Sequence, residues 1–212
     1  MSAPLSPGAP TLILIPTPLE RERLQALGGL TRGSGLSELC GFGPVASAAR
    51  TAELVARFNP RRVLLIGCAG THARDTHPVG SAWRFESVAI DGVGSGEGQS
   101  FAGPGAMNLP QWTGPNGSVS DRLPLASGDA GLLLTVCAAA GDAAQAEQRR
   151  MRFPDAKAED MEAFGVAMAC HLNQVPLTVI RGMSNAAGER DKQQWQLDEA
   201  LASALALARE II

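Results

Sequence analysis

The stretch VPLTVIRGMSNAAGERDKQQW, residues 175–195, decides how the rest of the chain is interpreted. It begins with an apolar, β-branched run that predicts a buried strand, and a periodic helical pattern follows its end. Between strand and helix lie several polar or turn-forming residues: Ser184, Asn185, Gly188, Arg190 and Asp191. Because ligands of α/β proteins bind beyond the carboxyl ends of strands, Asn185 is a candidate for ligand contact. Arg190 and Asp191 are interpreted as a helix cap and an ion pair.

Apolar runs alternate with helical patterns along the whole chain. Strands are predicted at 11–16, 61–70, 83–91, 131–139 and 175–182. Helices are predicted from 18, within 41–58, over 158–173 and over 195–212. This order predicts one α/β domain with a mostly parallel sheet covered on both faces. The segments after Ile66, Val136 and Ile180 follow strands, so they can converge on one site.

Two segments lack such patterns. The first ten residues are expected to form a frayed, disordered tail, which leaves a domain over 11–212. Residues 92–120 are rich in Gly, Pro, Ser and Asn without periodicity, and are expected to form a mobile surface loop or a lid.

Composition excludes several classes of protein. The 212 residues are 45% hydrophobic and 18% charged, as in a soluble globular protein rather than a disordered one. A net charge of −3 gives no broad attraction to nucleic acid or to an anionic membrane. No apolar run is long enough to span a membrane, and the start does not resemble a signal peptide. We therefore expect a cytoplasmic protein.

Cysteine and histidine give no strong metal signal. The four cysteines are far apart and form no CxxC pair, which indicates free thiols in a reducing compartment. His72 and His77 share a polar segment, but a third ligand is missing, so a solvated loop is favoured over a metal site. We expect neither a metal nor a cofactor.

Two glycine-rich segments have both a structural and a functional interpretation. IGCAG, at 66–70, is neither a GxGxxG nor a P-loop motif. It fits a tight turn, or a row of backbone N–H groups that face a ligand oxygen or a water. GFGPV, at 41–45, fits a helix-start turn or a second wall of the same pocket. Local sequence favours the structural interpretation for both.

The acidic segment EDMEAF, at 159–164, is more specific. Glu159 and Asp160 are interpreted as partners of a helix dipole in a first turn. Glu162 lies between Met161 and Phe164, so its carboxylate is expected to be partly buried and to need donors, such as two sugar hydroxyls.

These segments together resemble a known family. From Phe153 onward, FPDAKAEDMEAFGVAMACHLNQVPLTVIRGMSNAAGERDKQQW resembles the carboxyl-terminal half of the purine nucleoside phosphorylase and nucleosidase superfamily. Within it, IRGMSN, GxRD and the Trp four residues later are most similar to the futalosine hydrolases of the alternative menaquinone pathway. IPTPLE, GFGPVASAARTA and LLIGCAG follow the family order and give weaker support. The resemblance implies a central mixed sheet, cleavage of an N-ribosidic bond and a homo-oligomer, either a dimer or larger.

The resemblance also implies a role for particular residues. Met161 and Glu162 correspond to the ribose-binding residues, and Asn185 to the residue that faces N7 of the purine. Glu20 corresponds to the water-activating carboxylate, with Glu22 as the alternative register. Ala69 and Gly70 correspond to the loop at the nucleophile, a position that holds water or phosphate.

These implied roles are chemically consistent. Cleavage gives a cation-like ribose, which a carboxylate at Glu162 would stabilise, and a purine that leaves with negative charge. An amide can accept from N7–H and donate to a 6-oxo oxygen, which suits hypoxanthine, the base of futalosine.

The nucleophile follows from two further positions. The superfamily's phosphorylases hold phosphate with an Arg and a Ser, where this chain has Leu65 and Cys68. Neither can balance the charge of a phosphate dianion, so water is the expected nucleophile.

Two departures keep alternatives open. Ala139 and Ala140 stand where nucleosidases often have a base-stacking aromatic residue, and Asp160 stands where relatives often have Glu. One alternative is an adenine-releasing nucleosidase for methylthioadenosine, S-adenosylhomocysteine or aminodeoxyfutalosine, which would normally have Asp at 185. The other is an inactive relative that still binds a ligand.

Overall fold

The computed structural model describes residues 9–30, 35–115 and 117–212. The helices are α1 (Pro18–Ala26), α2 (Pro44–Phe58), α3 (Ala143–Arg152), α4 (Ala163–Leu172) and α5 (Leu197–Arg209), with 3-10 turns η1 (Gly98–Ser100) and η2 (Lys192–Gln194). The strands are β1 (Thr11–Ile15), β2 (Leu36–Leu39), β3 (Arg62–Thr71), β4 (Ala82–Phe85), β5 (Ser87–Asp91), β6 (Trp112–Gly114), β7 (Gly117–Val119), β8 (Arg122–Pro124), β9 (Leu132–Val136), β10 (Ala156–Asp160) and β11 (Leu177–Ala186).

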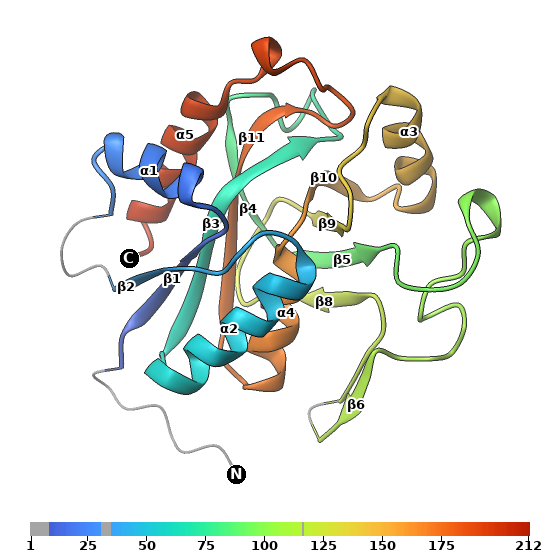
Figure 1. Cartoon of the computed structure of the whole chain (residues 1–212), viewed down its shortest axis with the longest axis horizontal. Helices are drawn as coiled ribbons and strands as arrows, with labels where there is room; N and C mark the ends of the chain where they lie inside the picture. The colour runs from blue at the N-terminus through green and yellow to red at the C-terminus, as the bar shows by residue number, and fades with distance from the viewer. Residues whose placement is uncertain (1–8, 31–34, 116) are drawn as a thin grey trace.

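A twisted mixed sheet forms the centre of the molecule (Figure 1). Its described strands follow the order β2-β1-β3-β10-β9-β5-β8, and β11 pairs with both β3 and β4. Most pairs are parallel, whereas β10 runs antiparallel to β3, β4 to β11 and β8 to β5. The α/β fold class predicted from the sequence, a central mixed sheet flanked by helices, is confirmed.

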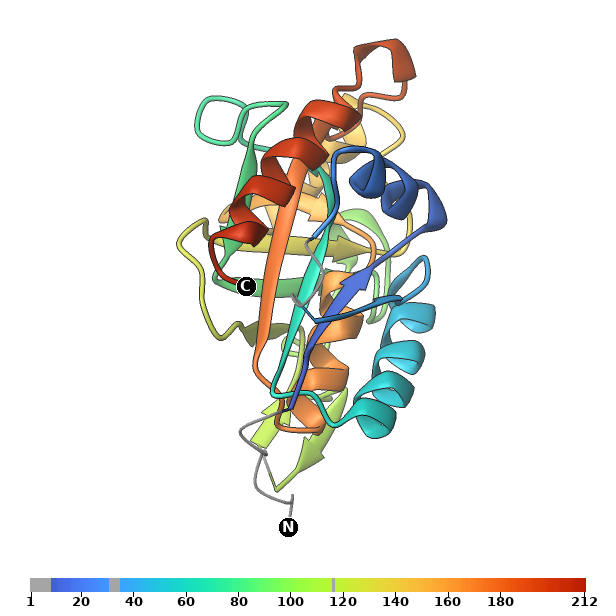
Figure 2. The ribbon, with the colours of Figure 1, turned by 90° about the vertical axis from the view of Figure 1, so that its left-hand side faces the viewer.

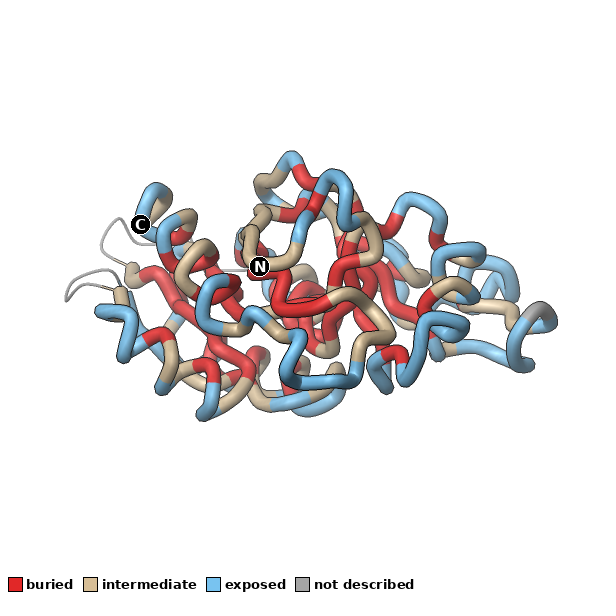
Figure 3. The backbone as a smooth tube through the Cα atoms, turned by 90° about the horizontal axis from the view of Figure 1, so that it is seen from above, coloured by how far each residue is buried: buried red, intermediate tan, exposed pale blue. Residues whose placement is uncertain are grey.

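Helices cover both faces of this sheet. Helix α5 lies along β11 and packs with α1 on one face, whereas α2 and α4 pack side by side on the other (Figure 2). The buried backbone runs through the middle of the molecule between exposed outer segments (Figure 3). All five residues of β1 and of β9 are buried, as expected for apolar runs in a sheet covered on both sides.

Two of the predicted elements each span more than one element of the structure. Residues 83–91 form two strands, β4 and β5, which lie in different parts of the sheet because the chain turns at Glu86. Residues 158–173 are only partly helical, since 156–160 form β10 and α4 begins at Ala163. The sequence also missed β2 and α3. Helical spacing of small and acidic residues concealed the short strand β10.

Segments outside the predicted pattern are only partly described. Residues 92–120 include η1, β6 and β7, joined by turns, but nothing tests the prediction that they form a lid. The expected tail falls largely on residues 1–8, which lie outside the described residues, so the domain boundary at residue 11 stays a prediction. In the part of the chain that the structure describes, every helix is too short or too polar to cross a membrane.

Candidate active site

A cavity of about 270 Å³ opens at the carboxyl ends of β3, β9 and β11. The three segments predicted to converge all contribute to its wall, although β3 and β11 continue as strands beyond Ile66 and Ile180. All of the predicted site residues line it: Glu20, Ala69, Gly70, Met161, Glu162 and Asn185. Glu22 is exposed and does not line the cavity, so the geometry favours Glu20 as the acidic residue of this turn.

Glu20 is fixed at the start of α1. Thr17 caps this helix by accepting from the Glu20 amide at 3.2 Å, and its hydroxyl donates to Glu20 Oε2 at 2.6 Å. The other oxygen, Oε1, accepts from the Cys68 amide at 3.0 Å and lies 3.4 Å from Cys68 Sγ. The acidic neighbour and burial both raise the pKa of the Cys68 thiol, burial being the larger cause, so the thiol is protonated and can donate. Glu20 is therefore held against the end of β3.

Glu162 lies at the cap position of α4 and is 5% exposed. Its Oε1 accepts from the Gly43 amide at the start of α2, at 3.1 Å. Its Oε2 lies 3.3 Å from Nη2 of Arg181. The GFGPV segment is thus a helix-start turn that also contacts the site, so both interpretations of this segment apply.

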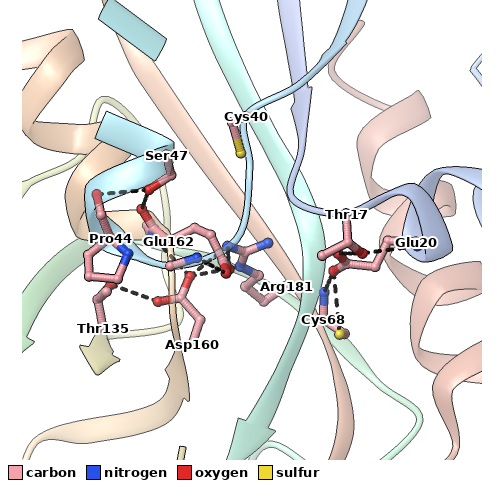
Figure 4. A network of polar contacts seen from close by, with 12 residues as sticks. Thr17, Glu20, Cys40, Pro44, Ser47, Cys68, Thr135, Asp160, Glu162 and Arg181 are labelled. Carbon is pink, nitrogen blue, oxygen red and sulfur yellow. Dashed lines mark hydrogen bonds and ion pairs between the residues drawn. The ribbon is translucent and has the colours of Figure 1, made fainter. Parts of the chain in front are cut away.

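Arg181 is a buried cation beneath the cavity. It is fully buried in β11, and its Nε and Nη2 donate to Oδ2 of Asp160 at 3.0 and 2.6 Å. Figure 4 shows Arg181 between the Asp160–Glu162 pair on one side and Glu20 with Cys68 on the other. A Cβ on Gly67 would lie 2.2 Å from Arg181 Nη1, so glycine at this position leaves room for the guanidinium. Gly67 of the IGCAG segment is therefore small for a structural reason, whereas Cys68, Ala69 and Gly70 of the same segment line the cavity.

The neighbours of Glu162 set its protonation. Burial raises the pKa of Glu162 to about 7, because Arg181 opposes this effect only in part and Asp160 adds to it. Asp160 takes two hydrogen bonds from Arg181, and it also accepts from Thr135 Oγ1 at 2.7 Å and from the Ala163 amide at 2.9 Å. Glu162 thus receives a smaller share of the local positive charge.

Asn185 lies within β11 rather than just past it, and is 8% exposed. Its Oδ1 accepts from the Ser184 hydroxyl at 2.7 Å, and its Nδ2 donates to the Ala186 carbonyl at 2.8 Å. These contacts fix the orientation of the amide and use one lone pair and one N–H. The side chain therefore keeps one acceptor and one donor position for a ligand.

The interpretation of Glu159 and Asp160 as first-turn dipole partners is wrong, because both lie in strand β10. Glu159 is 4% exposed and lines the cavity. Its Oε1 accepts from the Ala140 amide at 2.8 Å, and its Oε2 accepts from Arg149 Nη1 at 2.8 Å. Both carboxylates are buried parts of charged clusters.

The histidine segment is not the solvated loop that the sequence favoured. His77 is buried, lies 3.1 Å from the Ala130 carbonyl through Nε2 and packs on Trp83. The His72 side chain is also buried, with Nε2 3.2 Å from Glu159 Oε2. Both imidazoles have structural neighbours, and within the described ranges no three His, Cys, Asp or Glu side chains gather as metal ligands do.

Arg190 and Asp191 act separately. Asp191 caps η2 by accepting from the Gln193 amide at 3.0 Å, in agreement with the predicted helix cap. Arg190 lies over the Trp195 ring, 5.5 Å from its centroid, instead of pairing with Asp191 as expected. Both Arg190 and Trp195 line the cavity.

Sequence reasoning missed several residues of the cavity. Ala139 and Ala140 line it as expected, and Phe42 and Trp195 add aromatic side chains to its wall. Arg181 carried an available signal, since an arginine inside an otherwise apolar strand is rarely buried unless it is paired. For Glu159 the sequence contained no such signal, because the residues of β10 have the spacing of a helix.

Comparisons with known proteins agree with this architecture. Residues 18–212 match the family model described as the phosphorylase superfamily. The chain belongs to the phosphorylase superfamily. A 5'-methylthioadenosine/S-adenosylhomocysteine nucleosidase of Psychromonas ingrahamii is 30% identical over 81% of this chain and 78% of its own length. This relative places the chain among the nucleosidases of the superfamily.

A second group of relatives matches over a shorter stretch. Futalosine hydrolase of Streptomyces coelicolor is 45% identical over 73 residues, which is 34% of this chain and 31% of that protein. This match therefore spans only about a third of either chain.

Solved structures support the fold. A Neisseria meningitidis 5'-methylthioadenosine/S-adenosylhomocysteine nucleosidase superposes with a TM-score of 0.73 at 20% identity, covering 94% of this chain and 96% of that one. Futalosine hydrolase of Helicobacter pylori superposes with a TM-score of 0.71 at 18% identity, covering 94% and 95%. At these identities, the likeness concerns the fold alone.

Proposed function

We propose that this nucleosidase hydrolyses the N-ribosidic bond of futalosine, releasing hypoxanthine and dehypoxanthine futalosine in the alternative menaquinone pathway. The observation that carries the proposal is the amide of Asn185, which is held by Ser184 and Ala186. Its unused lone pair can accept from N7–H, and its unused N–H can donate to the 6-oxo oxygen of hypoxanthine. The bond to the 6-oxo oxygen strengthens as negative charge develops on the departing base, and the bond to the Asn185 oxygen forms once N7 has taken up a proton from solvent.

The ribose is assigned to the other end of the cavity. Glu162 would accept from the 2′- and 3′-hydroxyls, with Met161 beside it in the wall. The Gly43 amide and Arg181 hold the carboxylate in place. As the bond from the anomeric carbon to the purine breaks, its electron pair passes to the base. Negative charge on Glu162 then stabilises the cation-like sugar.

Water is the proposed nucleophile, and Glu20 the base that takes its proton. Cys68 stands at one of the positions with which phosphorylases hold phosphate, and its amide donates to Glu20. A phosphate dianion placed there would face the carboxylate of Glu20, and Leu65 is apolar and fully buried. Both features disfavour a phosphorylase.

The test is an assay of free base from futalosine, inosine and methylthioadenosine, with and without phosphate. The proposal predicts hypoxanthine release from futalosine at a rate that phosphate leaves unchanged, without any sugar phosphate. Accumulation of a ribose 1-phosphate product would assign the chain to the phosphorylases. Absence of cleavage on all three nucleosides would favour an inactive, ligand-binding relative.

A second candidate function rests on the extent of the sequence match. The methylthioadenosine/S-adenosylhomocysteine nucleosidase of Psychromonas ingrahamii aligns with 81% of the chain, whereas the futalosine hydrolase match covers 34%. Adenine release is thus the alternative, and methylthioadenosine in the assay above distinguishes the two. A cytoplasmic location, a homo-oligomer and the absence of a metal or cofactor stay predictions.

A further inference from the structure

The cavity wall that follows β9 consists of small residues, which have no long side chain to anchor them. Residues 138–140 follow the end of this strand, and Ala139 and Ala140 line the cavity. Ala140 is 1% exposed, so its backbone N–H needs a partner within the protein. The position of this wall therefore depends on contacts that other segments make with its backbone.

Two charged side chains hold the backbone of this wall. Glu159 Oε1 accepts from the Ala140 amide at 2.8 Å, and Glu159 Oε2 accepts from Arg149 Nη1 at 2.8 Å. The same guanidinium donates through Nη2 to the Ala138 carbonyl at 2.5 Å. Arg149 and Glu159 thus close a ring of hydrogen bonds around Ala139, with one bond to the residue on each side of it.

Arg149 comes from a helix that has little apolar packing. The structure describes all of α3, and within this helix Ala146 alone is buried. Ion pairs attach the helix to the sheet: Arg149 Nη1 lies 2.8 Å from Glu159 Oε2, and Arg152 Nη2 lies 2.5 Å from Asp91 Oδ2. Because so little apolar area is buried, these charged contacts decide where α3 and the wall before it lie.

The surroundings of Glu159 suit this role. Burial by itself would raise the pKa of Glu159, but His72, the Ala140 amide and Arg149 together outweigh burial and lower this pKa below its ordinary value. An ionised carboxylate accepts stronger hydrogen bonds than a neutral acid. The planar guanidinium of Arg149 can donate to Glu159 and to the Ala138 carbonyl at once, which a single ammonium group does with less fixed geometry.

We propose that Arg149 is a positioning residue, which acts through Glu159 to fix the 138–140 wall against which the nucleoside binds. Glu20 and Glu162 have other hydrogen-bond partners, so loss of the ring should leave both of these groups in place. A displaced wall then weakens binding of the ground state and the transition state alike, which raises KM and leaves kcat. The choice of nucleoside in this inference rests on the proposed function.

The first experiment measures kcat and KM for futalosine in wild type, Arg149→Gln and Arg149→Lys. Arg149→Gln should raise KM roughly tenfold or more and leave kcat within about threefold of wild type. Arg149→Lys keeps the charge and should restore part of the affinity. Arg150→Gln is the matched control on the same helix, because Arg150 forms an exposed ion pair with Glu147, and it should leave both constants unchanged. A fall in kcat without a rise in KM would overturn the inference.

Hydrogen exchange supplies a readout that does not depend on turnover. In Arg149→Gln, backbone amides of residues 137–142 should exchange roughly tenfold faster or more, whereas those of the buried strand β1 should keep their wild-type rates. Where Arg149→Gln does not fold, Arg149→Lys should show a smaller change of the same kind. Unchanged exchange in the wall, or faster exchange with an unchanged KM, would overturn the inference. A wild-type protein that cleaves no nucleoside would disprove the proposed function, and exchange in the wall would still test the role of Arg149.

Discussion

Two carboxylates of one short segment differ in pKa although they are almost equally buried. Glu159, at the proposed base end of the cavity, is 4% exposed, and Glu162, at the ribose end, is 5% exposed. The pKa of Glu159 is lowered, whereas the pKa of Glu162 is raised to about 7. The difference lies in their donors. Glu159 has the Ala140 amide, His72 and Arg149, which lies closer to it (2.8 Å) than to Asp91 (3.7 Å). Glu162 has the Gly43 amide and Arg181, which lies closer to Asp160 (2.6 Å) than to Glu162 (3.3 Å).

The comparison shows that burial alone does not set the charge of a carboxylate. At the base end, the neighbours of Glu159 favour its ionised form. The ribose end has a carboxylate that is easily protonated when the cavity lacks a ligand. Sugar hydroxyls would supply the donors that Glu162 lacks, so substrate binding should favour its ionised form.

Glu20→Gln should have the largest effect, because it removes the proposed base while Thr17 and Cys68 stay in place. We expect kcat for futalosine to fall by roughly 100- to 10,000-fold, the usual contribution of general base catalysis. Steady-state kinetics at neutral pH measures this loss. Glu22→Gln is the control, since Glu22 is exposed, and should retain wild-type activity. The opposite pattern would exchange the roles of the two residues.

Glu162→Gln should lose about 2–4 kcal/mol of transition-state stabilisation, or roughly 30- to 1,000-fold in kcat/KM. The amide keeps the shape of the side chain but cannot balance a cation-like ribose. The same kinetic assay measures the loss. The control is Glu53→Gln, which changes an exposed ion pair with Arg50 and should leave kcat/KM unchanged. Near wild-type turnover in Glu162→Gln would place the ribose elsewhere.

The same variant should change how stability depends on pH. The pKa of Glu162 is raised in the folded protein, so its contribution to stability is complete below the ordinary value of 4.5 and is lost as pH rises to about 7. A shift from 4.5 to about 7 corresponds to about 3 kcal/mol at most. Urea unfolding between pH 5 and 8 should show wild type losing stability relative to Glu162→Gln. Parallel pH profiles would mean that Glu162 titrates normally.

Asn185→Asp tests the base end with a smaller expected effect. An ionised Asp repels the 6-oxo oxygen, whereas a protonated Asp can donate to N7 of an adenine and accept from its 6-amino group. The ratio of kcat/KM for futalosine to that for its 6-amino analogue should fall roughly tenfold or more. Asn173→Asp, at the exposed end of α4, is the control. An unchanged ratio in Asn185→Asp would mean that Asn185 does not contact the base.

One residue at each end of the cavity was predictable from the sequence. Apolar runs and helix patterns predicted the α/β class and the three segments that converge on the cavity, because both depend on local periodicity. Glu162 was predicted to be partly buried from its apolar neighbours. Asn185 was found because it follows a strong strand pattern. These signals are local, so a single sequence contains them.

The residues that sequence reasoning missed depend on pairing between distant segments. Glu159 lies in the cavity because β10 runs antiparallel to β3, and no local pattern indicated that strand. Arg149 reaches Glu159 from α3, a helix that the sequence did not predict. The pKa of Glu162 depends on a cation in β11 and on the amide of Gly43, which precedes α2. Sequence predicts which residues are available, but register and packing decide which of them meet.

The central claim is that this cavity cleaves a 6-oxopurine nucleoside. Its most direct test is kcat/KM of the wild-type protein for futalosine and for the 6-amino analogue, measured side by side without phosphate. With the Asn185 amide matched to a 6-oxopurine, futalosine should be preferred at least tenfold. Equal values, or a preference for the 6-amino analogue, would contradict the account and favour an adenine-releasing nucleosidase.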